Sequence, residues 1–170
     1  MERKIKMKLQ STNSVPVTTH CLIYGDAKSG KTRLIPTCPS PVICNTDDGL
    51  SSIRQHQLPF MTCRKWAEIQ EFTDWIVGSK EASQFETFVY DDLTELCEIF
   101  LIEERPRHKN TLQAYGELEQ KVNLMFRSLR NIQGKNIVFL CKQEWIKDDS
   151  SGMFVYGPRV PGRALPPDLP

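Results

Sequence analysis

Residues 20–34 read HCLIYGDAKSGKTRL and join a short apolar run to a glycine-rich segment. Within this stretch, residues 25–32 (GDAKSGKT) fit the pattern G-x-x-x-x-G-K-[S/T] at every position. The apolar run predicts a strand before the loop, and a helix is expected after it, which is the context that this phosphate-binding motif requires. A chance loop that happens to start a helix is the alternative, and the two flanks argue against it.

The glycine-rich loop has a defined physical role in this pattern. Gly25 and Gly30 let the backbone wrap around phosphate oxygens, and successive N–H groups form an anion site. Lys31 is expected to act on the β- and γ-phosphates as a catalytic residue, and the Thr32 hydroxyl to ligate Mg²⁺. The predicted cofactors are therefore ATP and Mg²⁺. The expected nucleotide-binding residues are Gly25, Asp26, Ala27, Lys28, Ser29, Gly30, Lys31, Thr32 and Arg33.

Apolar segments of two kinds alternate along the chain. Short, continuously apolar runs at residues 20–24, 41–44, 87–90 and 136–141 are typical of strands buried on both faces. Longer segments at 66–76, 93–100 and 118–132 repeat their apolar residues every three or four positions, as amphipathic helices do. This alternation predicts an α/β fold, a mostly parallel sheet with helices on both faces.

The two ends of the chain differ from this core. Residues 1–18 form a basic segment, and residues 19–143 are expected to make up the core of a single domain over 1–170. Residues 144–170 are expected to form a β-hairpin around the DDSSG turn and then a proline-rich tail. The sequence stops at PPDLP without a closing element, so a natural C-terminus and a truncated fragment both stay open.

Composition excludes several classes of protein. With 39% apolar and 25% charged residues among 170, the chain is neither disordered nor collagen-like. It has no run of 18 apolar residues and no signal-peptide core, so we expect a cytoplasmic protein without a membrane partner. The cysteines show no zinc-ligand spacing and are expected to be buried thiols. They are Cys21, Cys38, Cys44, Cys63, Cys97 and Cys141.

Two carboxylates follow the predicted strand at residues 87–90. Ligands of open α/β sheets bind at the carboxyl ends of strands, so Asp91 is expected in the water shell of Mg²⁺ and in the catalytic set. Asp92 opens the predicted helix DDLTELCEIF. An Asp in that position is favoured as a helix N-cap over a second metal carboxylate.

Hydrolysis also needs a group that orients or deprotonates water. Asp47 follows the second predicted strand at the same sheet edge and is the candidate base. The surrounding NTDDG is also strong turn chemistry, and the role of Asp48 stays open. After the fourth predicted strand, Lys142 and Gln143 are candidates to sense the γ-phosphate, with Gln143 in the catalytic set. A solvated strand end is the alternative.

The formal net charge of +1 hides an uneven distribution of charge. Residues 1–40 carry a net +5, residues 41–104 a net −9 and residues 105–170 a net +5. Residues 105–110 (RPRHKN) are expected to form a mobile surface loop. Contact with nucleic-acid phosphates is one interpretation, and local pairing with Glu103 and Glu104 is the other. The nucleic-acid candidates are Arg105, Arg107, Lys109, Arg127 and Arg130.

Six blocks in order give the sequence a resemblance to a known family. They are LIYGDAKSGKTRL, PSPVICNTDDGL, FVYDDLTEL, AYGELEQKVNLMFRSLR, NIVFLCKQE and GPRVPGRALPPDLP. Together they resemble the RecA-type branch of P-loop ATPases, and more closely the AAA/RecA-type ATP-binding proteins of bacteriophages implicated in single-strand annealing and recombination. Such proteins usually have Glu where this chain has Asp47, and the shorter side chain implies weak hydrolysis.

The resemblance also implies partners and a location. Single-stranded DNA, a phage single-strand binding protein and further copies of the chain, in a ring or filament, would be its partners in the bacterial host cytoplasm. Two other functions stay open: a nucleotide-binding switch or assembly module with little hydrolysis, and a small-molecule kinase. The kinase is disfavoured because its candidate lid residues, Arg159 and Arg163, lie in the proline-rich tail.

Overall fold

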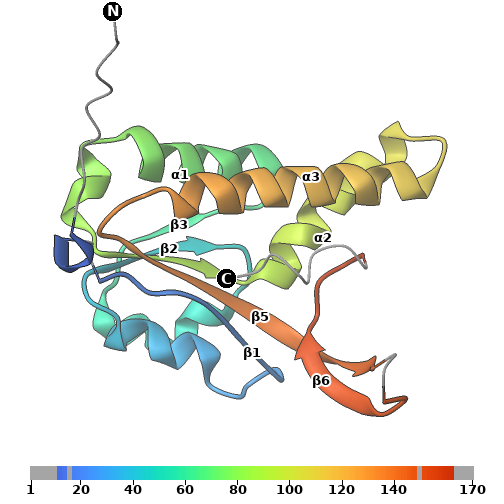
Figure 1. The fold of residues 1–170 in the computed structure, drawn as a ribbon, viewed down its shortest axis with the longest axis horizontal. Coiled ribbons are helices and arrows are strands. Elements are labelled where there is room, and N and C mark those ends of the chain that lie inside the picture. Colours follow the sequence, from blue (N-terminus) through green and yellow to red (C-terminus); the bar gives the residue numbers. More distant parts are fainter. Residues whose placement is uncertain (1–10, 15–16, 149–150, 163–170) are drawn as a thin grey trace, which may run out of the picture.

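The computed structural model describes residues 11–14, 17–148 and 151–162. Its sheet has the strand order β1-β5-β4-β2-β3, with every neighbouring pair parallel (Figure 1). A sixth strand, β6, pairs antiparallel with β5. The strands are β1 (His20–Gly25), β2 (Pro41–Asn45), β3 (Phe60–Thr62), β4 (Thr87–Asp91), β5 (Asn136–Lys147) and β6 (Phe154–Pro158). Residues 1–10 of the basic segment and residues 163–170 of the tail lie outside the described residues.

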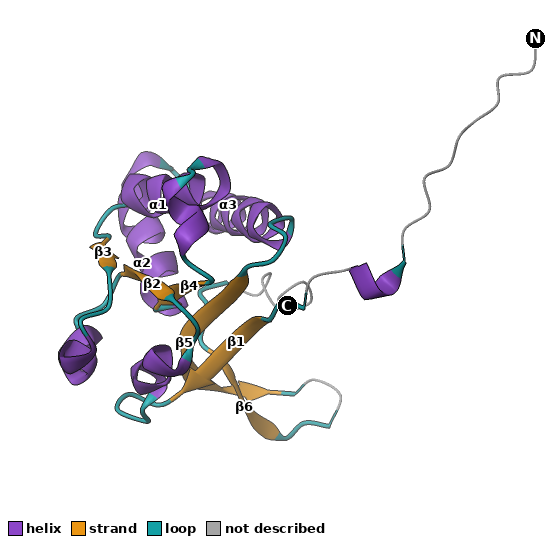
Figure 2. Cartoon of the chain, turned by 90° about the vertical axis from the view of Figure 1, so that its left-hand side faces the viewer, coloured by secondary structure: helices purple, strands orange, loops and turns teal. Residues whose placement is uncertain are grey.

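Helices cover both faces of the parallel sheet (Figure 2). The α-helices α1 (Trp66–Gly78), α2 (Leu93–Glu104) and α3 (Thr111–Arg130) pack on one face. The 3₁₀ helices η2 (Lys31–Thr37) and η3 (Gly49–His56) pack on the other. Three further 3₁₀ turns are η1 (Thr12–Ser14), η4 (Glu81–Gln84) and η5 (Arg105–Arg107). The predicted α/β fold with helices on both sides of a mostly parallel sheet is confirmed.

The central strand β4 shows why the buried strands of the sheet are continuously apolar. Phe88 and Tyr90 face the three α-helices, whereas Val89 faces η2 and η3, and all three are fully buried. A strand covered on both sides has no solvent-exposed face, so its sequence does not alternate with polar residues. The Tyr90 hydroxyl is satisfied by Thr73 on α1 at 2.9 Å.

The segment after the glycine-rich loop is shorter than the helix expected there. It forms the seven-residue 3₁₀ helix η2, with Pro36 inside it. Proline has no N–H to donate to a helical hydrogen bond and its ring clashes with the preceding turn, so a longer α-helix is disfavoured at this point. The chain turns out of η2 at Cys38, whose N–H donates to the Ile35 carbonyl at 3.0 Å.

The predicted C-terminal hairpin is present, but it continues a core strand. The sequence predicted that the fourth strand ends at Cys141, and this is wrong, because β5 runs without a break to Lys147. Its second half pairs with β6 from Gln143↔Pro158 to Lys147↔Phe154. Beyond Cys141 the strand leaves the helical layers, so its residues become half-exposed and then exposed.

Two expectations from composition can be compared with the described residues. All six cysteines are free, and Cys44, Cys63, Cys97 and Cys141 are buried while Cys21 and Cys38 are half-buried. In the part of the chain that the structure describes, no helix has the length and apolar character needed to cross a membrane.

Candidate nucleotide-binding site

The glycine-rich loop leaves the carboxyl end of β1 and folds back closely on itself. Gly30 has φ +96°, in the left-handed region that favours glycine. A Cβ on Gly25 would lie 2.9 Å from Ser29 Oγ, so the Ser29 side chain would have to turn away to admit a larger residue. The backbone conformation therefore favours glycine at Gly30, and the close approach of Ser29 favours a small residue at Gly25.

Lys31 holds its ammonium group over this loop. Its Nζ donates to the carbonyl oxygens of Gly25 at 2.8 Å and Asp26 at 2.9 Å. The adjacent cavity has a volume of about 400 Å³, within the range of about 300–1,000 Å³ that is usual for small-molecule sites. It is lined by Lys28, Gly30, Lys31, Thr32, Arg33, Gly49 and Ser52. The structure thus brings the cationic and hydroxyl groups of the motif to one cavity.

Thr32 and Asp91 meet at the floor of the site although 59 positions separate them. The Thr32 hydroxyl donates to Asp91 Oδ2 at 2.9 Å, and Asp91 is only 4% exposed. Burial raises the pKa of Asp91 to about 6, although the hydrogen bond from Thr32 works in the opposite direction. A hydroxyl and a carboxylate side by side are the hard oxygen ligands that Mg²⁺ takes, so these residues fit a magnesium ion.

Gly49 is a site residue that the sequence reasoning missed. It is the first residue of η3, and a Cβ there would lie 3.4 Å from Thr32 Oγ1 and 3.9 Å from Asp91 Oδ2. A glycine keeps the space beside the hydroxyl–carboxylate pair open. The sequence carries this glycine at the end of NTDDG, where turn chemistry alone is enough to account for it.

Asp92 is the N-cap of α2, as its position in the sequence favoured. Its Oδ1 accepts a hydrogen bond from the Glu95 N–H at 2.7 Å. Its own N–H donates to Thr46 Oγ1 at 2.8 Å, and the Thr46 hydroxyl donates to the Asp92 carbonyl at 2.9 Å. The side chain of Thr46, which the sequence did not single out, therefore fixes the backbone immediately after Asp91.

Lys142 lies between two carboxylates at the same edge of the sheet. Its Nζ is 3.2 Å from Glu95 Oε2 and 3.8 Å from Asp47 Oδ2. Partial burial works to lower the pKa of Lys142, but the neighbouring carboxylates, Asp92 first among them, raise it overall. Asp47 also accepts a hydrogen bond from the Asp48 N–H at 2.7 Å. The candidate base is thus beside a lysine, and Glu95 is a third group that the sequence did not single out.

Gln143 lies next to Lys142 on β5, but strand geometry turns its side chain to the other face. Leu140 packs on the side of η2 and η3, whereas Cys141 packs on the side of the α-helices. Successive residues of a strand alternate between faces. Gln143 therefore shares the face of Cys141, and Lys142 is the residue directed at the acidic groups. A role for Gln143 in sensing phosphate stays a prediction.

The basic segment at residues 105–110 includes the short 3₁₀ helix η5 where a loop was expected. Arg107 Nη1 pairs with Glu104 Oε1 at 2.6 Å. Arg105 donates to the Tyr115 hydroxyl at 2.7 Å, and its guanidinium carbon is 5.4 Å from the centre of that ring. Local pairing therefore occupies Arg107, as the alternative interpretation expected, while Glu103 accepts the Trp66 N–H instead.

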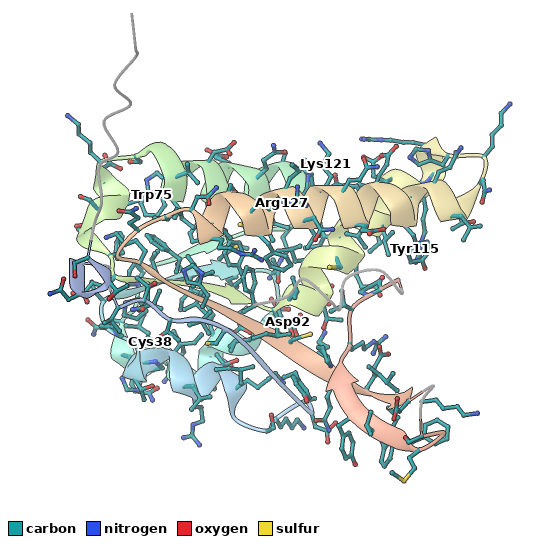
Figure 3. The ribbon with its side chains drawn as sticks, in the orientation of Figure 1. Cys38, Trp75, Asp92, Tyr115, Lys121 and Arg127 are labelled. Carbon is teal, nitrogen blue, oxygen red and sulfur yellow. The ribbon has the colours of Figure 1, made fainter. Side chains whose placement is uncertain are left out.

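The remaining basic candidates lie at the opposite end of α3. Arg127 and Arg130 are in the last turn of this 20-residue helix, whereas η5 precedes its first turn. Figure 3 shows Arg127 well separated along α3 from Tyr115, the residue that Arg105 contacts. At a rise of 1.5 Å per residue, a helix of this length spans about 30 Å. The two sets of cations are not brought together. Whether either set contacts nucleic acid stays a prediction.

The chain matches one family model and is similar to many solved structures, among them the following two. The family model described as an AAA domain matches residues 18–164. No curated protein sequence matches the chain. The crystal structure of the RadB recombinase has a TM-score of 0.47 at 15% identity, and the match covers 81% of this chain and 66% of that one, just under two thirds. The flagellar accessory protein FlaH from Methanocaldococcus jannaschii has a TM-score of 0.40 at 12% identity, with 84% and 77% covered.

Proposed function

The chain belongs to the AAA domain family, and from this premise we propose that it is a Mg²⁺-dependent ATPase whose turnover responds to single-stranded DNA. The observation that carries the ATPase proposal is the 2.9 Å contact between Thr32 Oγ1 and the buried Asp91 carboxylate beside the glycine-rich loop. A phosphate-binding loop alone holds an anion, whereas this pair adds the oxygen ligands for a metal–nucleotide complex.

Some residues of the site would bind the nucleotide and the metal ion, and others would act in hydrolysis. Thr32 would hold Mg²⁺ directly and Asp91 through its water shell, and the bound ion supplies charge neutralisation on the phosphates. Lys31 exchanges its bonds to the Gly25 and Asp26 carbonyls for bonds to phosphate oxygens. Asp47 orients the attacking water, and its short side chain favours slow hydrolysis.

Lys142 supports a sensing role in the same proposal. Its ammonium group is held between Glu95 and Asp47, and a phosphate anion arriving at the site competes with these carboxylates for it. When Lys142 turns to the phosphate, Asp47 loses a cationic neighbour and becomes a stronger hydrogen-bond acceptor for water. This would link water activation to the presence of the γ-phosphate.

The DNA part of the proposal rests on the distribution of charge and on the resemblance of the sequence to bacteriophage annealing and recombination proteins. Arg105, Arg107 and Lys109 are exposed at the turn between α2 and α3. Cations at such positions contribute affinity for phosphates that falls with salt. We place the activity in DNA recombination or single-strand annealing in a bacterial host, with a homo-oligomer and a phage single-strand binding protein as partners.

One experiment separates this function from its alternatives. ATP turnover is measured with Mg²⁺ alone, with a single-stranded oligonucleotide and with small phosphate acceptors, using Asp91→Asn as the control for background hydrolysis. Stimulation by the oligonucleotide supports the proposal. Phosphate transfer to a small acceptor would identify a kinase instead. Tight ATP binding without turnover under any condition would identify a nucleotide-dependent switch or assembly module.

A further inference from the structure

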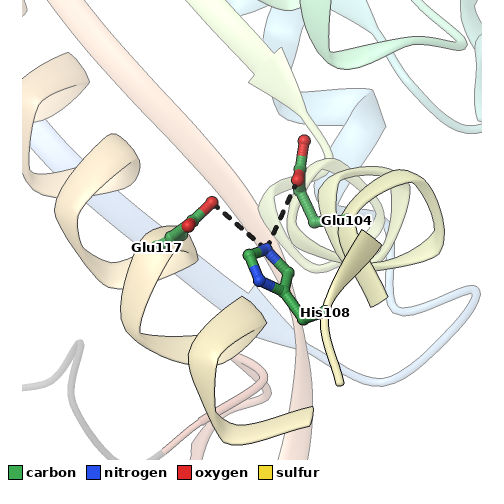
Figure 4. Close-up of side chains that lie close together, drawn as sticks. All are labelled: Glu104, His108 and Glu117. Carbon is green, nitrogen blue, oxygen red and sulfur yellow. Dashed lines mark ion pairs between the residues drawn. The ribbon is translucent and has the colours of Figure 1, made fainter. Parts of the chain in front are cut away.

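The corner between α2 and α3 gathers three side chains that offer metal-ligand atoms (Figure 4). Glu104 ends α2, His108 follows η5, and Glu117 lies on α3. His108 Nε2 is 3.6 Å from Glu104 Oε2 and 3.5 Å from Glu117 Oε2. One ligand atom from each of the three residues lies within 4.8 Å of the others. None of these residues belongs to the nucleotide-binding site.

The Nε2 atom of His108 is buried and, among the residues that the structure describes, makes no hydrogen bond, although both carboxylates lie within ion-pair distance of a protonated imidazole. The two carboxylate oxygens are farther away than the about 2.7–3.2 Å of an N–H···O bond. A buried polar atom without a hydrogen bond is unfavourable, so the position between the two carboxylates favours an additional ligand.

We propose that this corner binds a transition-metal dication such as Zn²⁺ through His108 Nε2 and one oxygen each of Glu104 and Glu117. Zinc takes nitrogen and carboxylate oxygen at about 2.0–2.2 Å in a tetrahedron, which separates the ligand atoms by about 3.3–3.5 Å. The separations of 3.5 and 3.6 Å from His108 Nε2 are close to this spacing. The imidazole favours zinc over Mg²⁺ and Ca²⁺, which prefer oxygen ligands.

The surroundings already orient one of the three ligands and partly bury a second. Arg107 holds Glu104 by its other oxygen, Oε1, at 2.6 Å, and this leaves Oε2 directed at His108. The Glu104 and His108 side chains are only 17% and 18% exposed, whereas Glu117 is 47% exposed. A hydrogen-bonded carboxylate and a buried imidazole form a preset pair. Glu117 completes the site from α3, and solvent supplies the remaining ligand.

The three ligands come from different elements of the chain, so a bound ion would connect these elements. Glu104 belongs to α2 and Glu117 to α3, so a bound ion connects the two helices at the base of the basic turn. Such a site exists only in the folded chain, and binding therefore stabilises the folded state increasingly as the metal concentration rises. The ion would fix the corner that carries Arg105, Arg107 and Lys109.

The test uses the full chain stripped of metal and titrated with Zn²⁺ by calorimetry. We expect one site that His108→Gln and Glu117→Gln each weaken at least tenfold. His56→Gln and Glu119→Gln are matched controls and should bind Zn²⁺ as the wild type does. Zinc should raise the melting temperature of the wild type and of both controls more than that of the two ligand variants.

X-ray absorption at the zinc edge identifies the ligands directly and does not depend on ATP turnover. The expected shell contains only nitrogen and oxygen at about 2.0–2.2 Å. A sulfur shell would assign the ion to thiols such as the adjacent pair Cys44 and Cys63, and loss of binding in Asp91→Asn would assign it to the nucleotide site. Either result, or unchanged affinity in a folded Glu117→Gln variant, would overturn the proposal.

Discussion

The carboxyl edge of the sheet and the corner between α2 and α3 both gather charged side chains, but they use them differently. At the sheet edge, Lys31 is bonded to backbone carbonyls beside a cavity, and Asp91 is buried against a hydroxyl. At the corner, Arg107 is paired with the carboxylate three positions before it. A charged side chain that is hydrogen-bonded only to neutral groups beside a cavity can exchange these bonds for bonds to a ligand. A charged side chain that is paired with a nearby opposite charge has less to gain from a ligand.

The largest effect is expected for Lys31→Ala. Hydrogen bonds to charged groups are worth about 1.5–3 kcal/mol each, so loss of the ammonium should weaken ATP binding by about 1,000-fold or more. The fold should be kept, because Lys31 bonds only to loop carbonyls. The measurement is a nucleotide titration together with a circular dichroism spectrum. If the folded variant bound ATP as tightly as the wild type, Lys31 would not act on a ligand, and the contrast between the sheet edge and the corner would be wrong.

The carboxylates of the sheet edge should separate into two roles. Asp91→Asn is expected to lose Mg²⁺-dependent binding, whereas Asp47→Asn should keep binding and lose about 100-fold in turnover, as for a group that only activates water. Nucleotide affinity and turnover are measured for both variants, with Asp48→Asn as the control. Equal effects of the first two changes on affinity would contradict this division.

Because Asp91 is buried, its ionised carboxylate should lower the free energy of unfolding of the nucleotide-free protein. Its pKa is raised from 3.8 to about 6, so the folded state holds the proton more tightly than the unfolded chain. The ionised group therefore destabilises the fold increasingly from about pH 4 to about pH 6, and by a constant amount above that. At pH 8, Asp91→Asn should raise the free energy of unfolding by as much as about 3 kcal/mol.

Urea unfolding at several pH values measures this effect on Asp91. The gain from Asp91→Asn should shrink as the pH falls and be absent near about pH 4. Asp48 has a side chain that is 93% exposed and serves as the control, because Asp48→Asn should change stability little at either pH. A gain that is the same at about pH 4 and about pH 8 would mean that ionisation of Asp91 is not its cause.

The smallest effect is expected at the corner. Replacing Arg105, Arg107 and Lys109 together with Ala should weaken single-stranded DNA binding and flatten its salt dependence by up to about 0.7 log units for each phosphate that is no longer neutralised. ATP binding should not change. Lys109→Ala alone should account for more of the effect than Arg107→Ala, because Arg107 is already paired. The slope is obtained from the affinity for a labelled oligonucleotide at several salt concentrations. An unchanged slope in the triple variant would mean that these three side chains are solvent-exposed charges that do not contact DNA.

The sequence predicted those parts of the site that follow from local rules. The loop motif, the capping position of Asp92 and the place of Asp91 after a buried strand each depend on neighbours in the chain. The contacts of Thr46 and Glu95 depend on which strands lie side by side, and no local pattern encodes that. Pro36 was visible in the sequence, but the strength of the loop motif favoured a full helix after it.

The end of the fourth strand was misplaced for a related reason. Residues 136–141 are apolar because helices cover both sides, and the following KQEWIK has the mixed polarity of a segment outside the sheet. The strand continues, but only its first half is covered, so its composition changes while its backbone does not. A hydrophobic run shows which residues are buried. It shows where a strand ends only if the helices that cover the strand end at the same place.

The unbroken course of β5 makes the hairpin a direct continuation of a strand that carries a residue of the site, Lys142. Trp145, Phe154 and Tyr156 are exposed on it, a few residue pairs from Lys142 along the ladder. The Lys142 carbonyl also accepts the Arg159 N–H at 2.7 Å, and this ties the far end of β6 to the same residue. Trp145 lies on the same continuous strand as Lys142, the lysine between Glu95 and Asp47. Phe154 and Tyr156 are held beside that strand by the pairing of β6 with β5. The hairpin and the nucleotide-binding edge therefore share one strand, and a displacement of one along the sheet would have to break or shift the register that joins it to the other.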